Sequence, residues 1–148
     1  MNHFRFLALL LLTSCSFASE NITDEINVLS TNMKLIEKNG KCYLIHDDVK
    51  KSLHPIPPCH FLRNSKNNVQ YFTYKDIKVD AALIITGTPV SKEVRKEWGL
   101  PNDLVCGTES QGILMRNSKI EITEKTLKEG VLCRDKGSDE KNFWYFSH

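Results

Sequence analysis

Four cysteines, which we expect to form two disulfides, constrain the fold of this chain more than any other feature of its sequence. These cysteines follow the first eighteen residues and are Cys42, Cys59, Cys106 and Cys133. An even number of cysteines in an exported chain predicts disulfides, and three pairings exist in principle. We favour Cys42 with Cys59 and Cys106 with Cys133, because each pair lies on neighbouring predicted strands and neighbours in sequence usually pair in space. A zinc site needs closer cysteine and histidine spacings, so we expect no metal at these residues.

Residues 1–18 have the pattern of a signal peptide. Arg5 gives a short basic start, residues 6–12 form an apolar run, and Ser16 and Ala18 are the small residues that precede a cleavage site. The apolar run is shorter than the roughly 20 residues that a transmembrane helix needs. We therefore expect export, with cleavage after Ala18.

A second processing route stays open at Cys15. Residues 12–15 read Leu-Thr-Ser-Cys, which resembles a bacterial lipobox in which the cysteine is lipidated. Cleavage after Ala18 predicts a periplasmic or secreted protein. Lipidation predicts a lipoprotein whose membrane attachment is through Cys15 only.

The charges of the chain are almost balanced, with 20 lysines and arginines against 18 aspartates and glutamates. Nucleic-acid binding needs a clustered basic face, and the sequence shows no such cluster, so we expect neither nucleic acid nor a polybasic membrane contact. Residues 19–148 suffice for one domain that buries roughly two thirds of its unfolded surface. No repeat or linker divides them, so we expect a single exported domain.

The segment after the signal peptide has the spacing of an amphipathic helix. Its apolar residues recur at steps of four and three: Ile22, Ile26, Leu29, Met33 and Ile36. Thr23 can cap the start of this helix, and Gly40 can end it. We expect its apolar stripe to form one face of the core.

Strands are predicted along most of the remaining chain. The segments with strand composition are 41–46, 60–63, 69–74, 81–86, 104–106, 112–116, 119–123 and 130–133. Residues 60–74 predict a hairpin, and the continuously apolar 81–86 predicts a central strand buried on both faces.

A further short helix is predicted at 91–98, with Ser91 as its cap and Gly99 at its end. Trp98 lies four residues after Val94, so we expect it to be buried on the same helical face. The aromatic residues 143–146 should pack back as an edge strand or a last turn. The fold class is therefore α+β: an N-terminal amphipathic helix packed on a mainly antiparallel sheet, with one further short helix and two disulfides.

The sequence shows no recognisable catalytic set. Ser110 lacks the preceding glycine of a nucleophile elbow, and the cysteines are assigned to disulfides. His54 and His60 could form a metal pair with Asp47 or Asp48, but their spacing matches no metal motif. We therefore assign no catalytic residue, metal or cofactor.

The loop from 47 to 58, together with His60, is the predicted contact surface, and the alternative is that this loop is only a rigid connection between two strands. Its three prolines lower the entropy lost on docking, and the residues assigned to binding are Leu53, His54, Ile56 and His60. We expect a non-enzymatic exported protein that binds another exported protein or an envelope component, such as an inhibitor or immunity-type factor. The alternatives are a small exported hydrolase with a site near His54 and His60, and a structural lipoprotein anchored through Cys15.

Overall fold

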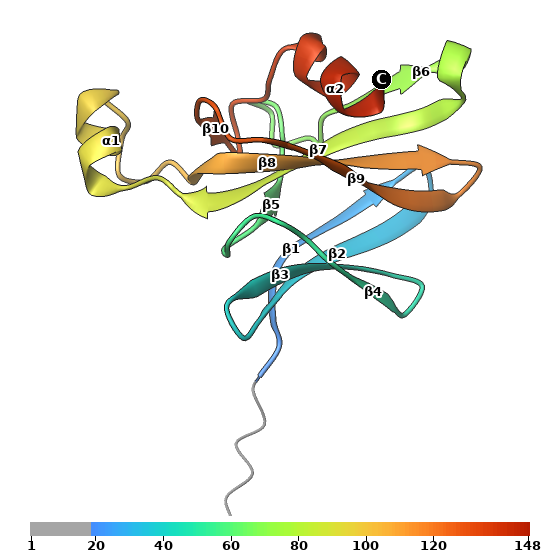
Figure 1. Ribbon diagram of the computed structural model, residues 1–148, viewed down its shortest axis with the longest axis horizontal. Helices are drawn as coiled ribbons and strands as arrows, with labels where there is room; N and C mark the ends of the chain where they lie inside the picture. Colours follow the sequence, from blue (N-terminus) through green and yellow to red (C-terminus); the bar gives the residue numbers. More distant parts are fainter. Residues whose placement is uncertain (1–18) are drawn as a thin grey trace, which may run out of the picture.

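Two antiparallel sheets make up the fold in the computed structural model, which describes residues 19–148 (Figure 1). The predicted signal peptide and the lipidation of Cys15 lie outside the described residues. The first sheet is a four-stranded meander of β1 (Asn21–Val28), β2 (Thr31–Lys38), β3 (Lys41–His46) and β4 (Val49–Ser52).

The second sheet has six strands, and two long strands form its centre. It consists of β5 (His60–Phe61), β6 (Tyr71–Tyr74), β7 (Val79–Pro89), β8 (Cys106–Arg116), β9 (Lys119–Leu127) and β10 (Leu132–Cys133). β7 pairs with β5, β6 and β8, while β8 also pairs with β9 and β10. A 3-10 helix, η1 (Lys75–Ile77), precedes β7, α1 (Lys92–Glu97) lies between β7 and β8, and α2 (Glu140–Ser147) ends the chain.

The predicted N-terminal helix is wrong, because β1 and β2 form a hairpin there. Ile26 and Val28 alternate along β1 and are buried, and they pair with Met33 and Thr31 of β2. The helical spacing therefore does not follow burial, because Ile22 of the stripe is exposed whereas Val28 and Leu35, outside it, are buried. Leu29, counted in the helical stripe, is exposed in the hairpin turn at a φ of 49°. The fold is thus mostly β with two packed sheets, rather than a helix on a sheet.

The dipeptide Asn39-Gly40 is typical of a hairpin turn, and it joins β2 to β3. Both residues have positive φ, at 53° and 69°, as a two-residue type I′ turn requires, and Asn-Gly is the dipeptide most typical of that turn. Gly40 therefore joins β2 to β3 rather than ending a helix.

The main core lies between the two sheets. It is built from alternate residues of the strands that face each other, including Met33, Leu35, Leu44, Phe61, Leu83, Ile85 and Ile113. The intervening residues of β7 and β8 point to the other face of the larger sheet, which α2 covers. The prediction that 81–86 is a central strand buried on both faces is therefore confirmed.

The aromatic C-terminus packs back as a helix rather than as an edge strand. Phe143 and Phe146 of α2 are buried against the outer face of the larger sheet. A Cβ on Gly112 of β8 would lie 2.5 Å from the Cβ of Phe146, so the glycine lets the helix approach closely.

The two disulfides are confirmed, with the pairing that the sequence favoured. Cys106 and Cys133 occupy opposed positions of β8 and β10. Cys42 belongs to β3, however, whereas Cys59 precedes β5, so this bridge joins the two sheets instead of neighbouring strands. Within the described residues no helix is both long and apolar enough to cross a bilayer.

The hairpin predicted for 60–74 differs from the observed pairing. β5 and β6 both pair with β7, and the two halves of the segment are joined only locally, by a bridge between Arg63 and Val69 and by backbone hydrogen bonds beside it, such as that from the Gln70 amide to the Leu62 carbonyl. The loop between β5 and β6 therefore leaves the sheet, and the chain then returns to pair with β7 again.

Candidate functional site: the arm end

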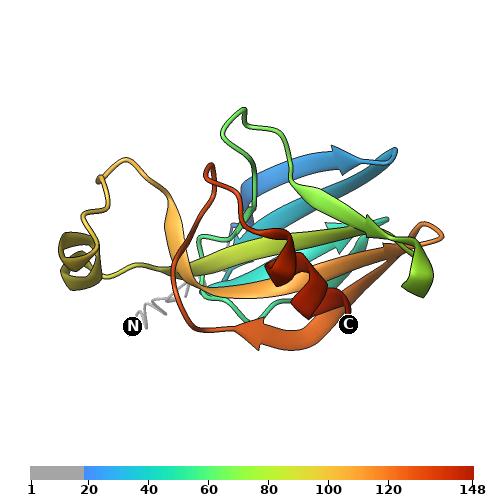
Figure 2. The ribbon, with the colours of Figure 1, turned by 90° about the horizontal axis from the view of Figure 1, so that it is seen from above.

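One segment projects beyond both sheets and defines an end of the molecule. We call residues 90–105 the arm; it carries α1, which extends past the strands in both Figure 1 and Figure 2. The Ser91 hydroxyl accepts a hydrogen bond from the amide of Val94, and Gly99 follows the helix with a φ of 62°. The predicted short helix at 91–98 is thereby confirmed.

The arm is held in one conformation by its own hydrogen bonds. The Arg95 guanidinium donates to the carbonyl oxygens of Pro101 at 3.0 Å and Leu104 at 2.8 Å. These bonds fold the second half of the arm back onto the helix. At its base, Val90 packs with the Cys106–Cys133 disulfide in a small apolar cluster, so the projection is attached rigidly to the larger sheet.

Trp98 is exposed, and the expectation that it is buried is wrong. Its exposed fraction is 53%, because α1 ends at Glu97 and Trp98 is the C-cap of the helix. Val94, the residue expected to share its face, packs instead against the cluster at the base of the arm. The shortness of the helix therefore places a large aromatic side chain in solvent.

The loop of residues 53–59 lies beside the base of the arm. Thr88, close to the end of β7, accepts from the amide of Ile56 through its hydroxyl at 3.0 Å and donates its own amide to the Ile56 carbonyl at 2.6 Å. Ile56 is itself 57% exposed. Because the arm begins two residues after Thr88, Ile56 and the arm belong to the same end of the molecule, which we call the arm end.

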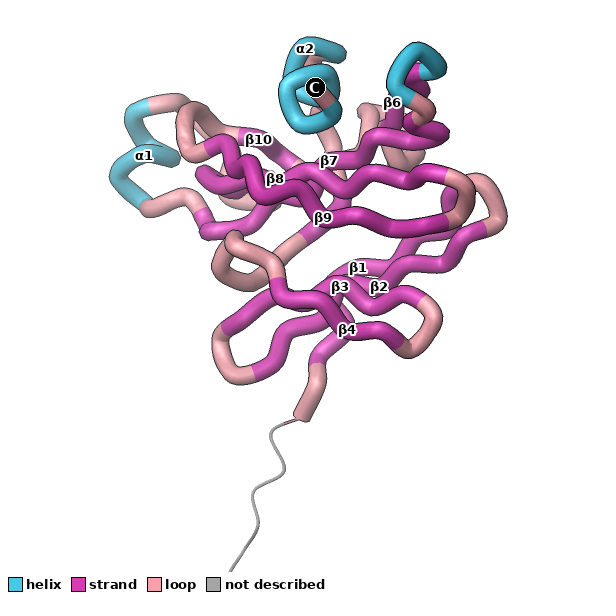
Figure 3. The backbone as a smooth tube through the Cα atoms, turned by 45° about the vertical axis from the view of Figure 1, so that its right-hand side comes forward, coloured by secondary structure: helices cyan, strands magenta, loops and turns pink. Residues whose placement is uncertain are grey.

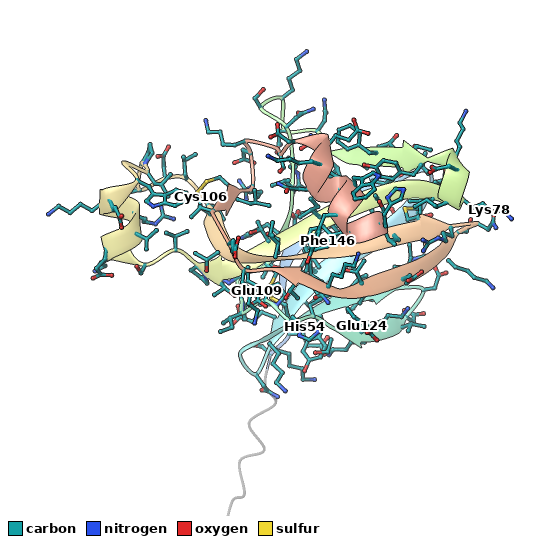
Figure 4. All side chains as sticks on the ribbon, turned by 45° about the horizontal axis from the view of Figure 1, so that its top comes forward. His54, Lys78, Cys106, Glu109, Glu124 and Phe146 are labelled. Carbon is teal, nitrogen blue, oxygen red and sulfur yellow. A yellow bond between two sulfur atoms is a disulfide. The ribbon has the colours of Figure 1, made fainter. Side chains whose placement is uncertain are left out.

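The structure separates the four residues assigned to binding. Ile56 and His60 belong to the arm end, whereas Leu53 is buried in the main core. His54 lies on another side, where its amide donates to the Gln111 side chain and its neighbours include Glu124 (Figure 4).

A cleft of about 250 Å³ lies between the loop and the arm. Pro58 and His60 line it from the loop and β5, Thr86 and Pro89 from β7, and the arm contributes Arg95, Asn102 and Asp103. The cleft is thus formed by segments far apart in sequence, and sequence reasoning could not assemble it.

His60 is the most unusual polar residue of the cleft. It is 9% exposed, and within the described residues its Nδ1 has no hydrogen-bond partner. Burial lowers the pKa of His60, while the charge of Asp24 opposes this shift and those of Arg134 and Arg63 add to it. The imidazole is therefore neutral at neutral pH.

An ion pair behind His60 fixes the strand on which it lies. Arg63 donates to both carboxylate oxygens of Asp24, at 2.6 and 2.7 Å, and Asp24 also accepts from the amide of Phe61. Both side chains are almost buried. This contact joins β1 to the β5 segment, and no sequence motif predicted it.

A second hollow, of about 360 Å³, lies between β4 and β9. Both strands are at the edges of their sheets, on the same side of the molecule (Figure 3). The Lys51 side chain crosses between them and donates to the Ile120 carbonyl at 2.8 Å. Lysines on edge strands oppose pairing with another chain, so we give this hollow less weight than the arm end.

The metal pair considered from the sequence gains no support from the structure. Across residues 19–148 no group of three or more histidine, cysteine, aspartate or glutamate side chains is arranged to hold a metal ion. His54 and His60 lie at different surfaces.

No family model, curated protein or solved structure matches this chain. Its class therefore rests on the fold and the arm end themselves: a mostly β protein of two sheets and two disulfides, with a rigid projecting arm.

Proposed function

We propose that the protein is a non-enzymatic exported protein that binds another exported protein or an envelope component through its arm end, as an inhibitor or immunity-type factor does. The observation that carries this proposal is the exposed Trp98 on an arm that Arg95 and a disulfide hold in place. Tryptophan is enriched among the residues that dominate binding energy. A preorganised segment also loses little entropy when it docks.

The surroundings of Trp98 suit a protein interface. Ile56 adds a second exposed apolar side chain at the same end, and Lys96 and Glu97 place opposite charges beside the tryptophan. Apolar anchors within a polar rim are the usual composition of such interfaces.

The two disulfides are consistent with an extracellular or exported location. Removal of residues 1–18, or lipidation at Cys15, completes the proposed route. The intact mass of the protein from its native host distinguishes the two products, and a mass that includes Met1 would contradict export.

The test is affinity capture from the native envelope fraction, followed by affinity measurements with the captured partner. Trp98→Ala should weaken that binding by about 2 kcal/mol or more, which is over tenfold. Trp144→Ala is the matched control, because Trp144 is 54% exposed but lies on α2, away from the arm. Equal affinities for the wild type and Trp98→Ala would contradict the proposal.

The same purified protein also tests the alternative that it is a hydrolase. If the purified protein hydrolyses an envelope substrate and His60→Gln abolishes that activity while the fold is retained, the enzyme reading replaces the binding one.

A further inference from the structure

We propose that the cleft beneath the arm is a binding site for a carboxylate, which His60 and Arg95 hold together. Both residues line the cleft of about 250 Å³. This inference goes beyond the proposed function, since a carboxylate can occupy the cleft whether or not a protein docks on Trp98.

The burial of His60 determines which ring nitrogen carries its proton. A neutral imidazole has one N–H donor and one acceptor nitrogen. Its Nδ1 is buried without a partner, and a buried N–H without a partner is rarer in proteins than an unfilled acceptor. We therefore place the proton on Nε2, which makes the N–H of Nε2 the donor that His60 can offer to a ligand in the cleft.

Arg95 supplies the second donor and the positive charge. A guanidinium has five N–H donors, and the hydrogen bonds to Pro101 and Leu104 use one on each terminal nitrogen. The remaining donors are available to a ligand in the cleft that Arg95 lines. Two donors with one positive charge complement a carboxylate, which only accepts hydrogen bonds.

The other charges around His60 are largely paired with each other. Asp24 pairs with Arg63, and Arg134 with Asp135 at 3.0 Å. The hydrogen bond from Arg134 lowers the pKa of Asp135, so this pair remains ionised. The electrostatic potential in the cleft is therefore set mainly by the residues that line it.

Asp103 affects which anion the cleft prefers. It lines the same cleft as Arg95, and its negative charge repels a multiply charged anion more strongly than a singly charged one. A monocarboxylate therefore fits better than phosphate or sulfate. The carboxylate could be a free small acid or the C-terminus of a polypeptide, because both present the same chemistry.

The experiment follows the His60 ring by NMR while acetate is added to the whole exported chain. The Cε1–H signal of His60 should shift saturably, and the pKa of His60 should rise with bound acetate because a carboxylate favours the imidazolium form. Inorganic phosphate should give a smaller effect at equal concentration. No saturable change with acetate at concentrations on the order of 100 mM would overturn the proposal, since weaker binding carries no recognition.

Variants separate the site from the surface as a whole. Arg95→Lys should weaken acetate binding severalfold, because a lysine keeps the charge but loses the planar set of donors. His46→Gln, which lies in the hollow beside β4, should leave acetate binding unchanged. An unchanged acetate affinity in a folded Arg95→Lys protein would contradict the assignment.

Two peptides identify the source of the carboxylate. If acetyl-Gly-Gly binds at least tenfold more tightly than both acetate and acetyl-Gly-Gly amide, the cleft receives a polypeptide C-terminus; equal binding of acetyl-Gly-Gly and acetate indicates a free acid. The two proposals can fail separately, because the acetate titration of the wild-type protein tests the cleft, whereas partner binding by Trp98→Ala tests the arm.

Discussion

Individual polar residues explain how the arm end is built. Asp24 is in the smaller sheet, yet its carboxylate holds Arg63 and the amide of Phe61 in the β5 segment. The same segment carries His60 to the cleft. A single buried ion pair therefore ties the site to the opposite sheet.

Asp24→Asn should lower the free energy of unfolding by about 3–5 kcal/mol, because it leaves the buried Arg63 without its counter-charge. Urea unfolding measures this change. Glu25→Gln is the matched control, since Glu25 is exposed in its pair with Lys34 and should cost at most about 0.5 kcal/mol. Equal losses in the two variants would show that the Asp24 pair contributes no more than a surface contact.

The lowered pKa of His60 predicts a loss of stability in mild acid. The unfolded chain binds a proton at the ordinary histidine pKa of 6.5, while the folded chain binds it only at lower pH. As the pH falls below 6.5, protons therefore stabilise the unfolded state first. The free energy of unfolding should decrease between pH 7 and pH 5.

The His60→Gln variant should have a shallower pH dependence in this range, measured by urea unfolding at each pH. A wild-type slope in His60→Gln would mean that His60 titrates in the folded protein as it does in the unfolded chain.

At the scale of elements, the sequence predicted strands and disulfides well and the N-terminal segment poorly. Residues 41–46 form a short apolar run and 119–123 alternate clearly, and both segments are strands in the structure. Residues 22–36 have helical spacing only when the two strands are read as one segment, and burial against the second sheet, which is a tertiary effect, makes them a hairpin instead. The exposure of Trp98 could not be predicted from the sequence either, since it depends on α1 ending one residue earlier than expected.

Removal of the Cys42–Cys59 disulfide by the double change to alanine should lower the free energy of unfolding by about 2–5 kcal/mol. This bridge joins the two sheets, so its loss frees the loop that contains Ile56. Urea unfolding and the count of free thiols in the denatured, unreduced wild type check the prediction. Two or more free thiols in that count would contradict both disulfides.

At the scale of the whole molecule, the arm end and the side formed by β4 and β9 differ in how open they are to a partner. The side formed by β4 and β9 is protected by lysines, one of which bonds across the hollow. The arm end instead combines a rigid projection, two exposed apolar side chains and a cleft. This asymmetry is the basis for assigning partner binding to the arm end.

Hydrogen exchange of the protein, free and with its captured partner, tests this assignment most directly. The account predicts slower exchange on binding at the amides of the arm, 90–105, and of the loop, 53–59, with β4 and β9 unchanged. Slower exchange confined to β4 and β9, with the arm exchanging as in the free protein, would contradict the account.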